Sequence, residues 1–135
     1  MALIFKYKKE LIDGEKFYFP KLPITLHNNQ NKTEQPALLD SGATAIFIPK
    51  HIADFLELEL GNSSTAESWT GKFKIFESKI WITLGKGSQT FRKQLSCNIP
   101  DIEGENEEVI LGRTFFQFFE ICFNEKNKTT KLKQI

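Results

Sequence analysis

The chain has 135 residues, of which 40% are hydrophobic and 26% are charged. This length fits a single domain, residues 1–135, that buries roughly two-thirds of its unfolded surface. The formal net charge is +1, so the charge balance gives no reason to expect nucleic acid or another polyanion as a partner.

The first half of the chain alternates apolar runs with polar turn residues. An apolar run at 17–26 is followed by a polar cluster at 27–36 and a second apolar run from residue 37, which predicts a hairpin with the cluster as its turn. Pro49 then opens a segment with apolar residues at helical spacing. This helix is expected to end at Gly61 and to bury one face, which comprises Ile52, Phe55, Leu56 and Leu60.

The second half continues the β pattern. Alternating residues at 72–76 and 79–84 predict two strands, and the glycines at 85–88 predict a turn into further β-structure. An acidic loop at 101–108 precedes a short helix at 114–119. The basic residues near the C-terminus alternate with Thr and Leu, which favours a solvated strand face: Lys126, Lys128, Lys131 and Lys133.

Cysteine usage and hydropathy indicate the environment of the protein. Cys97 and Cys122 could pair, but neither belongs to a CxxC motif or has a His at metal-ligand spacing. We therefore expect two reduced thiols and no metal or other cofactor. The apolar stretch at the N-terminus is short for a signal peptide, and no window approaches the roughly 18 apolar residues of a membrane span. The expectation is a cytoplasmic protein without membrane association.

One acidic residue stands out because it interrupts two apolar runs. Asp40 begins the sequence Asp-Ser-Gly-Ala within the segment 37–48, where an unpaired carboxylate would be costly. Gly42 permits a sharp turn, and Ser41 supplies a hydroxyl. Such a turn is suited to acid–base chemistry. The alternative is an Asx-type turn that is capped by the Asp side chain itself.

Two motifs together resemble a known family. The Asp-Ser-Gly-Ala segment resembles the active-site signature of aspartic proteases, and Ile-Leu-Gly-Arg at 110–113 resembles the segment that opens the C-terminal helix of retropepsins, the single-domain, retroviral-type aspartic proteases. Residues from about 118 to 133 resemble the closing hairpin of cellular and bacterial relatives. The resemblance covers roughly residues 18–132. It implies a mainly β fold, a closed barrel with one or two short helices, assembled as a symmetric dimer.

The chemistry of such enzymes explains why a dimer is expected. Peptide hydrolysis without a metal or a covalent intermediate needs a base and an acid, which two carboxylates sharing one proton can supply. Only Asp40, of four aspartates, lies in the signature, so the second carboxylate would come from another copy. We expect a homodimeric aspartic endopeptidase that cleaves extended peptides at apolar residues, with Asp40 as the catalytic residue and Ser41 and Gly42 supporting it.

The resemblance also implies substrate-binding residues. Gly42 and Ala43 would lie beneath the substrate backbone, and Phe47 and Ile110 would line the central side-chain pockets. A flap hairpin at about 65–76 would close over the peptide, with three residues near its tip: Trp69, Thr70 and Gly71. Trp69 is equally compatible with a core or edge aromatic residue.

The chain departs from the family pattern at one position, and its function has alternatives. Arg113 matches an arginine that in retroviral enzymes pairs with an acid four residues after the catalytic Asp, but Thr44 stands at that position. The contact of Arg113 must therefore differ. The alternative function is a non-catalytic dimeric module that binds peptides with the same fold, since a fold does not fix an activity. One half of a heterodimer is a further alternative.

Overall fold

The computed structural model describes residues 2–68, 71–102 and 108–135. Strands make up 65% of the structure, and the described residues contain two short helices. None of these helices is long and apolar enough to cross a membrane. The prediction of a mainly β fold with one or two short helices is confirmed.

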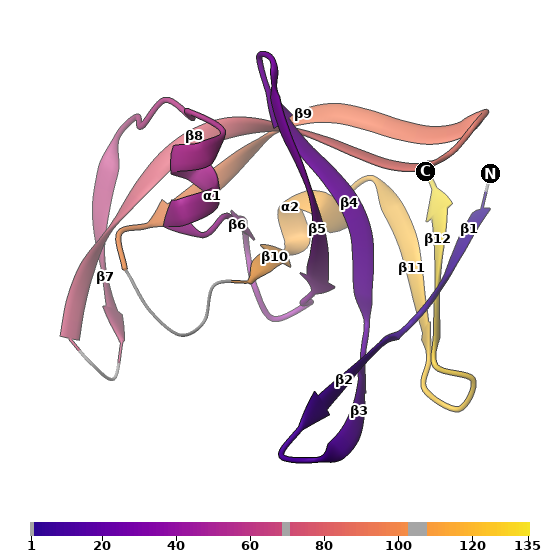
Figure 1. The fold of residues 1–135 in the computed structure, drawn as a ribbon. Coiled ribbons are helices and arrows are strands. Elements are labelled where there is room, and N and C mark those ends of the chain that lie inside the picture. The colour runs from indigo at the N-terminus through magenta and orange to yellow at the C-terminus, as the bar shows by residue number, and fades with distance from the viewer. Residues whose placement is uncertain (1, 69–70, 103–107) are drawn as a thin grey trace.

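Six strands close into a barrel (Figure 1). They pair in the order β4, β5, β10, β6, β9 and β8, and β8 pairs back to β4 through contacts such as Leu26 with Ile82. The strands are β4 (Lys21–Asn28), β5 (Asn31–Leu39), β6 (Ile46–Phe47), β8 (Gly71–Lys86), β9 (Gln89–Pro100) and β10 (Val109–Leu111). The predicted closed barrel is therefore confirmed.

The strand β10 lies between two strands that are consecutive in the sequence. It pairs in parallel with β5 and antiparallel with β6. The chain that connects β5 to β6, residues 40–45, must therefore loop around the end of β10. Asp40 is the first residue of this loop.

The remaining strands lie outside the barrel ring. The strand β7 (Ser63–Ser68) forms a hairpin with the start of β8. A separate sheet has the order β1 (Ala2–Lys6), β12 (Thr129–Gln134), β11 (Phe119–Asn124), and its β11–β12 hairpin lies at the position of the expected closing hairpin. The strands β2 (Lys8–Ile12) and β3 (Glu15–Phe19) form a further hairpin, which the sequence analysis did not assign.

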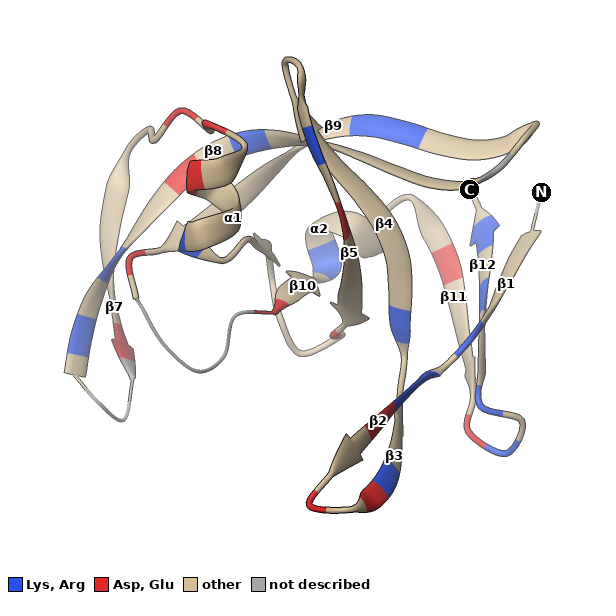
Figure 2. Ribbon diagram, in the orientation of Figure 1, with Lys and Arg blue, Asp and Glu red and all other residues tan. Residues whose placement is uncertain are grey.

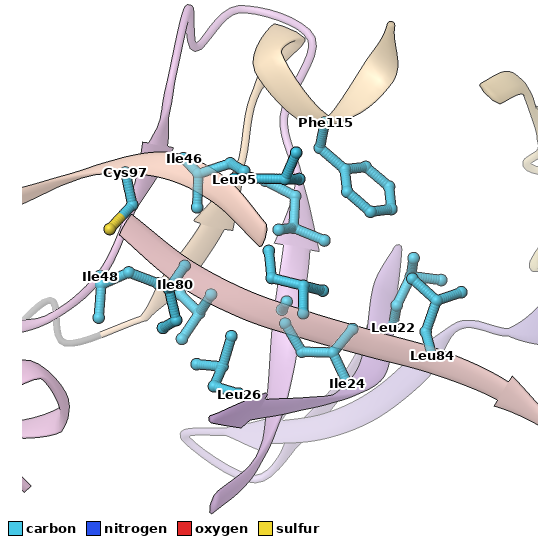
Figure 3. Packing of buried hydrophobic residues seen from close by; sticks show 14 of the residues in the cluster. Leu22, Ile24, Leu26, Ile46, Ile48, Ile80, Leu84, Leu95, Cys97 and Phe115 are labelled. Carbon is cyan, nitrogen blue, oxygen red and sulfur yellow. The ribbon is translucent and has the colours of Figure 1, made fainter. Parts of the chain in front are cut away.

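The barrel encloses the hydrophobic core (Figure 3). Residues alternate along each strand between the inside and the outside of the barrel, because successive strand side chains point to opposite faces. On β4, for example, Leu22, Ile24 and Leu26 are buried, whereas Pro23 is exposed. Phe115 from the second helix, α2 (Arg113–Phe116), is fully buried in the same cluster.

The helix predicted after Pro49 is shorter than expected, and part of its predicted buried face is wrong. The helix α1 spans Lys50–Phe55, because Glu57 adopts a left-handed conformation with φ 55°. Ile52 and Leu56 are buried as expected, but Phe55 is 60% exposed and Leu60 49% exposed. A helix of under two turns has only a narrow buried stripe, and the residues after it no longer follow helical spacing.

The side chain of Asn28 contributes to the end of α1. Its Nδ2 donates to the carbonyl oxygens of Leu56 at 3.0 Å and Glu57 at 3.2 Å. These carbonyls lie at the helix C-terminus, where the helix itself provides no donors. Leu58 then returns to the core, with 8% exposure.

Three other predicted boundaries are also wrong. The polar cluster 27–36 is mostly strand, since β4 and β5 pair up to Asn28 and Asn31. The two strands predicted at 72–84 are one continuous strand, β8, and α2 ends at Phe116 instead of residue 119. In β5 the exposed residues alternate with half-buried ones, so polar side chains occupy the solvent face of a regular ladder.

Candidate active site

The Asp40 turn is held by its own backbone and side chain. The backbone N–H of Gly42 donates to Asp40 Oδ1 at 2.9 Å, and the N–H of Ala43 donates to the Asp40 carbonyl oxygen at 3.2 Å. The Asx-type turn that the sequence offered as an alternative is therefore present. It occupies one carboxylate oxygen, while Oδ2 makes no hydrogen bond with the residues that the structure describes. A structural turn and an available carboxylate coexist at this residue.

The segment that follows β10 fixes the turn from the other side. The N–H of Asp40 donates to the Leu111 carbonyl at 3.1 Å, the N–H of Gly112 to the Ala45 carbonyl at 3.1 Å, and the N–H of Arg113 to the Ala43 carbonyl at 2.9 Å. These bonds join the two motifs that the sequence singled out. They make the Asp-Ser-Gly-Ala loop and the Ile-Leu-Gly-Arg segment one rigid unit.

Gly112 is required at this crossing for steric reasons. Its φ of −90° is accessible to any residue. A Cβ atom built on Gly112, however, would lie 2.2 Å from the Ala45 carbonyl oxygen and 2.6 Å from that of Ala43. The absence of a side chain therefore allows the two backbones to approach closely.

A row of partly exposed side chains crosses the outer face of the barrel beside Asp40. Ile110 pairs with Leu38 on one side and with Phe47 on the other, and Phe47 pairs with Asn98. Directly paired residues project from the same face of a sheet. Leu38 also precedes Asp40 by two residues, which places both on the same side of an extended chain. The carboxylate thus stands at the end of an apolar row.

The sequence analysis assigned two members of this row, Phe47 and Ile110, and missed Leu38 and Asn98. Leu38 could have been found from strand periodicity, because residues two apart in a strand share a face. Asn98 could not, since its place depends on the parallel pairing between β6 and β9. No local pattern in the sequence encodes that register.

Thr44 and Arg113 make contacts that differ from a side-chain ion pair. The carbonyl oxygen of Thr44 accepts hydrogen bonds from the backbone N–H and from the side-chain Oγ1 of Thr114, both at 3.2 Å. The Arg113 side chain is exposed and forms no ion pair with a described residue. Ser41 is also exposed, and its hydroxyl makes no hydrogen bond within the described parts of the chain.

The hairpin of β7 and β8 occupies the place expected for a flap. Its strands pair from Ser63 with Phe76 to Ser68 with Gly71, and Figure 1 shows it extending away from the barrel. Phe73 and Ile75 on β8 are half-buried, and Gly71 has a φ of 125°. Trp69 and Thr70, which we expected near the tip, lie outside the described residues.

Two hollows on the surface do not include the Asp40 loop. One, of about 640 Å³, lies between β4, β5 and the end of β8, and another, of about 830 Å³, lies beside the residues that follow α1. Neither is lined by a residue of the loop 40–45. Within residues 2–68, 71–102 and 108–135, no group of three or more His, Cys, Asp or Glu side chains is arranged to hold a metal ion.

Comparisons with known proteins agree with the topology. The chain superposes on a retropepsin-like aspartic protease from Rickettsia conorii with a TM-score of 0.67 and 18% identity, covering 98% of both chains. This chain has a retropepsin-like fold. The retroviral protease-like domain of Ddi1 from Leishmania major also superposes on the retropepsin-like fold of this chain, with a TM-score of 0.56, 15% identity, and coverage of 86% of this chain and 90% of that one.

The retropepsin-like fold is detected by structure and not by sequence comparison. No family model matches the chain, and no curated protein matches it. The resemblance predicted from the two short motifs is confirmed at the level of the fold. At 15% to 18% identity, the superpositions do not establish an activity or its residues.

Proposed function

We propose that this protein is an aspartic endopeptidase that acts as a homodimer, with Asp40 of each copy sharing in the activation of a water molecule. One observation carries the proposal. Asp40 has one carboxylate oxygen that bonds to no residue in the described part of the chain, in a turn that is fixed by four backbone hydrogen bonds around Gly112 and Gly42. A carboxylate held rigidly at the surface by backbone groups is preorganised for chemistry and contributes little to the core.

A second copy is needed because one carboxylate cannot act as both base and acid at the same time. Two Asp40 side chains related by a two-fold axis would share one proton, so that one carboxylate takes a proton from water while the other donates a proton to the peptide. The two reactants are water and the peptide whose bond is hydrolysed. No metal or other cofactor enters this scheme.

The apolar row supplies the expected substrate preference. Leu38, Ile110 and Phe47 line up beside Asp40 and offer a half-exposed apolar surface. An extended peptide whose side chains project toward this row would place apolar residues beside the bond to be cut. Gly42 and Ala43, which have little or no side chain, would allow the peptide backbone to approach the loop.

The hairpin of residues 63–76 would act as a flap over the bound peptide. Among the described strands, β7 pairs only with the start of β8, and a hairpin attached through one strand could bend over a bound peptide. In the dimer, two such hairpins would exclude water from the site. In this scheme Trp69, Thr70 and Gly71 would contact the substrate.

The test is cleavage of a diverse peptide mixture from about pH 4 to pH 7, comparing the wild type with Asp40→Asn. The wild type is expected to cut between apolar residues, with a maximum on the acidic side of neutral, because a pair of carboxylates keeps one shared proton there. The variant keeps the shape of the side chain and should form folded dimers without activity. If both proteins are confirmed as dimers and neither cleaves a peptide, the result would instead favour the peptide-binding module.

A further inference from the structure

The β2–β3 hairpin is an outlying part of the molecule. It pairs with no other strand among the described residues, and Figure 1 shows it extending beyond the barrel, past the turn that follows β5. An isolated two-stranded hairpin is marginally stable in water. Its role therefore depends on what anchors its base and on what covers its faces.

The base of the hairpin lies beside the candidate catalytic residue. Pro20 directly follows β3, and its carbonyl oxygen accepts a hydrogen bond from the N–H of Leu39 at 3.1 Å. In the antiparallel register of β4 with β5, Lys21 is opposite Leu38. Following the same register outward brings Phe19, the last residue of β3, toward Asp40. The hairpin therefore starts at the Asp40 turn and leads away from it.

A buried lysine fixes the direction of the hairpin. Lys21 is 7% exposed, and its Nζ donates to Glu10 Oε2 on β2 at 2.7 Å and to Glu108, directly before β10. Burial lowers the pKa of Lys21, but the hydrogen bonds to the two carboxylates outweigh it, so that the pKa lies above its usual value. The bond to Glu10 holds one face of the hairpin toward the barrel.

The opposite face of the hairpin is exposed and carries two large apolar side chains together with two lysines, Lys9 and Lys16. Leu11 alternates with Glu10 along β2, and Tyr18 is opposite Lys9, so Leu11 and Tyr18 share the face that points away from Lys21. Their exposed fractions are 66% and 44%.

Apolar exposure is concentrated in this hairpin. It holds four of the ten exposed large hydrophobic residues among the described ones, namely Leu11, Ile12, Phe17 and Tyr18. Ile12 and Phe17 lie on the face of Glu10, and Leu11 and Tyr18 lie on the other face, so both faces of this small element expose apolar side chains to a partner. Acidic and basic residues are interspersed along the same hairpin in Figure 2.

We infer that the β2–β3 hairpin is an arm that docks on a second copy of this chain through Leu11 and Tyr18. The inference rests on the proposed function. Two Asp40 carboxylates can share a proton only if both lie beside the two-fold axis, and the space beyond that axis belongs to the other copy. An element that is rooted at Asp40 and projects past it meets that copy. The arm then determines the protein concentration at which the site is complete.

The first test compares the variant Leu11→Ser/Tyr18→Ser with the wild type by sedimentation velocity over a range of concentrations. The dissociation constant of the dimer should rise at least ~100-fold, since each of the two substitutions removes an apolar contact worth roughly tenfold or more. The control is Phe55→Ser on α1, which removes a side chain of 60% exposure away from the hairpin in Figure 1. It should leave the dissociation constant unchanged.

A second measurement needs no substitution and guards against misfolding of the variant. Hydrogen exchange of the wild type is followed at concentrations below and above the dimer midpoint. The amides of residues 8–19 should become more protected as dimers form, whereas those of α1 should not. Protection that is independent of concentration overturns the inference.

The outcomes separate this inference from the proposed function. If the wild type is dimeric and cleaves peptides but the double variant has an unchanged dissociation constant, the role of the arm is refuted and the proposed protease activity is not. Intact dimers with a raised KM would assign the hairpin to peptide binding and also refute the arm. A wild type that is monomeric at every concentration and inactive refutes both.

Discussion

Substituting Gly112 by alanine tests whether the crossing of the two motifs positions Asp40. The new Cβ would lie 2.2 Å from the carbonyl oxygen of Ala45, and all three neighbouring atoms at under 3 Å are backbone atoms of the Asp40 loop. Backbone atoms cannot rotate away as a flexible side chain would. The loop and the β10–α2 segment must therefore separate by about 1 Å.

The magnitude follows from what this separation breaks. It strains the hydrogen bonds from Gly112 to Ala45 and from Arg113 to Ala43, which are 3.1 Å and 2.9 Å long. Overpacking together with two weakened hydrogen bonds should lower the free energy of unfolding by about 2–4 kcal/mol. A shift of about 1 Å in a reacting group costs roughly 100-fold in rate, so we expect kcat to fall by that factor or more.

Urea denaturation gives the stability, and peptide cleavage at dimer-saturating concentration gives kcat. The matched control is Gly87→Ala in the β8–β9 turn, where a Cβ would meet no atom within 4 Å and where only the φ of 57° is unfavourable. The free energy of unfolding of this control should fall by about 1–2 kcal/mol, and its activity should not change. If Gly112→Ala keeps both its stability and its kcat, the crossing does not position Asp40.

Two further predictions concern titration. The hydrogen bond from Lys21 lowers the pKa of Glu10 below its usual 4.5. The stabilisation is therefore present above pH 4.5 and is lost as the pH falls through the lowered value. Glu10→Gln should cost about 1 kcal/mol at pH 7, and the difference in Tm from the wild type should narrow as the pH falls below 4.5. A difference that does not narrow between pH 5 and pH 3 would contradict this account. Burial raises the pKa of the Cys97 thiol to about 12, whereas Cys122 is exposed. A thiol reagent at pH 8 should therefore modify Cys122 rapidly and Cys97 only after unfolding. Rapid modification of both thiols would refute the burial of Cys97.

Local patterns in the sequence predicted the parts of the structure that depend on neighbouring residues. The Asp40 turn follows from the conformational preferences of Asp and Gly, and most of β4 lies within the apolar run at 17–26 that predicted one arm of a hairpin. The barrel was predicted from the resemblance of two short motifs, because neither composition nor periodicity specifies strand order. The resemblance to the retropepsin-like fold was thus visible in a few residues around the candidate site, whereas identity over the whole superposition is 18%.

Features that depend on distant partners could not be predicted in this way. The polar residues 31–36 look like a turn, yet pairing with β4 makes them a strand whose exposed face is polar. Leu60 fits a helical face, but the reversal at Glu57 separates it from the helix, whereas Phe55 lies within α1 and outside its narrow buried stripe. The burial of Lys21 depends on Glu108, which is distant in sequence, so no local signal distinguishes it from the exposed lysines.

The insertion of β10 between β5 and β6 also governs when the site can form. Leu38 pairs with Ile110, so most of the barrel sequence lies inside the loop that this parallel contact closes. Closing a long loop is entropically unfavourable, and such pairings form late in folding. During synthesis, the residues of the Asp40 turn are complete long before β10 and Gly112, which fix the turn, have been added. We therefore expect the site to be assembled late in folding, because it needs a strand from the far end of the barrel sequence.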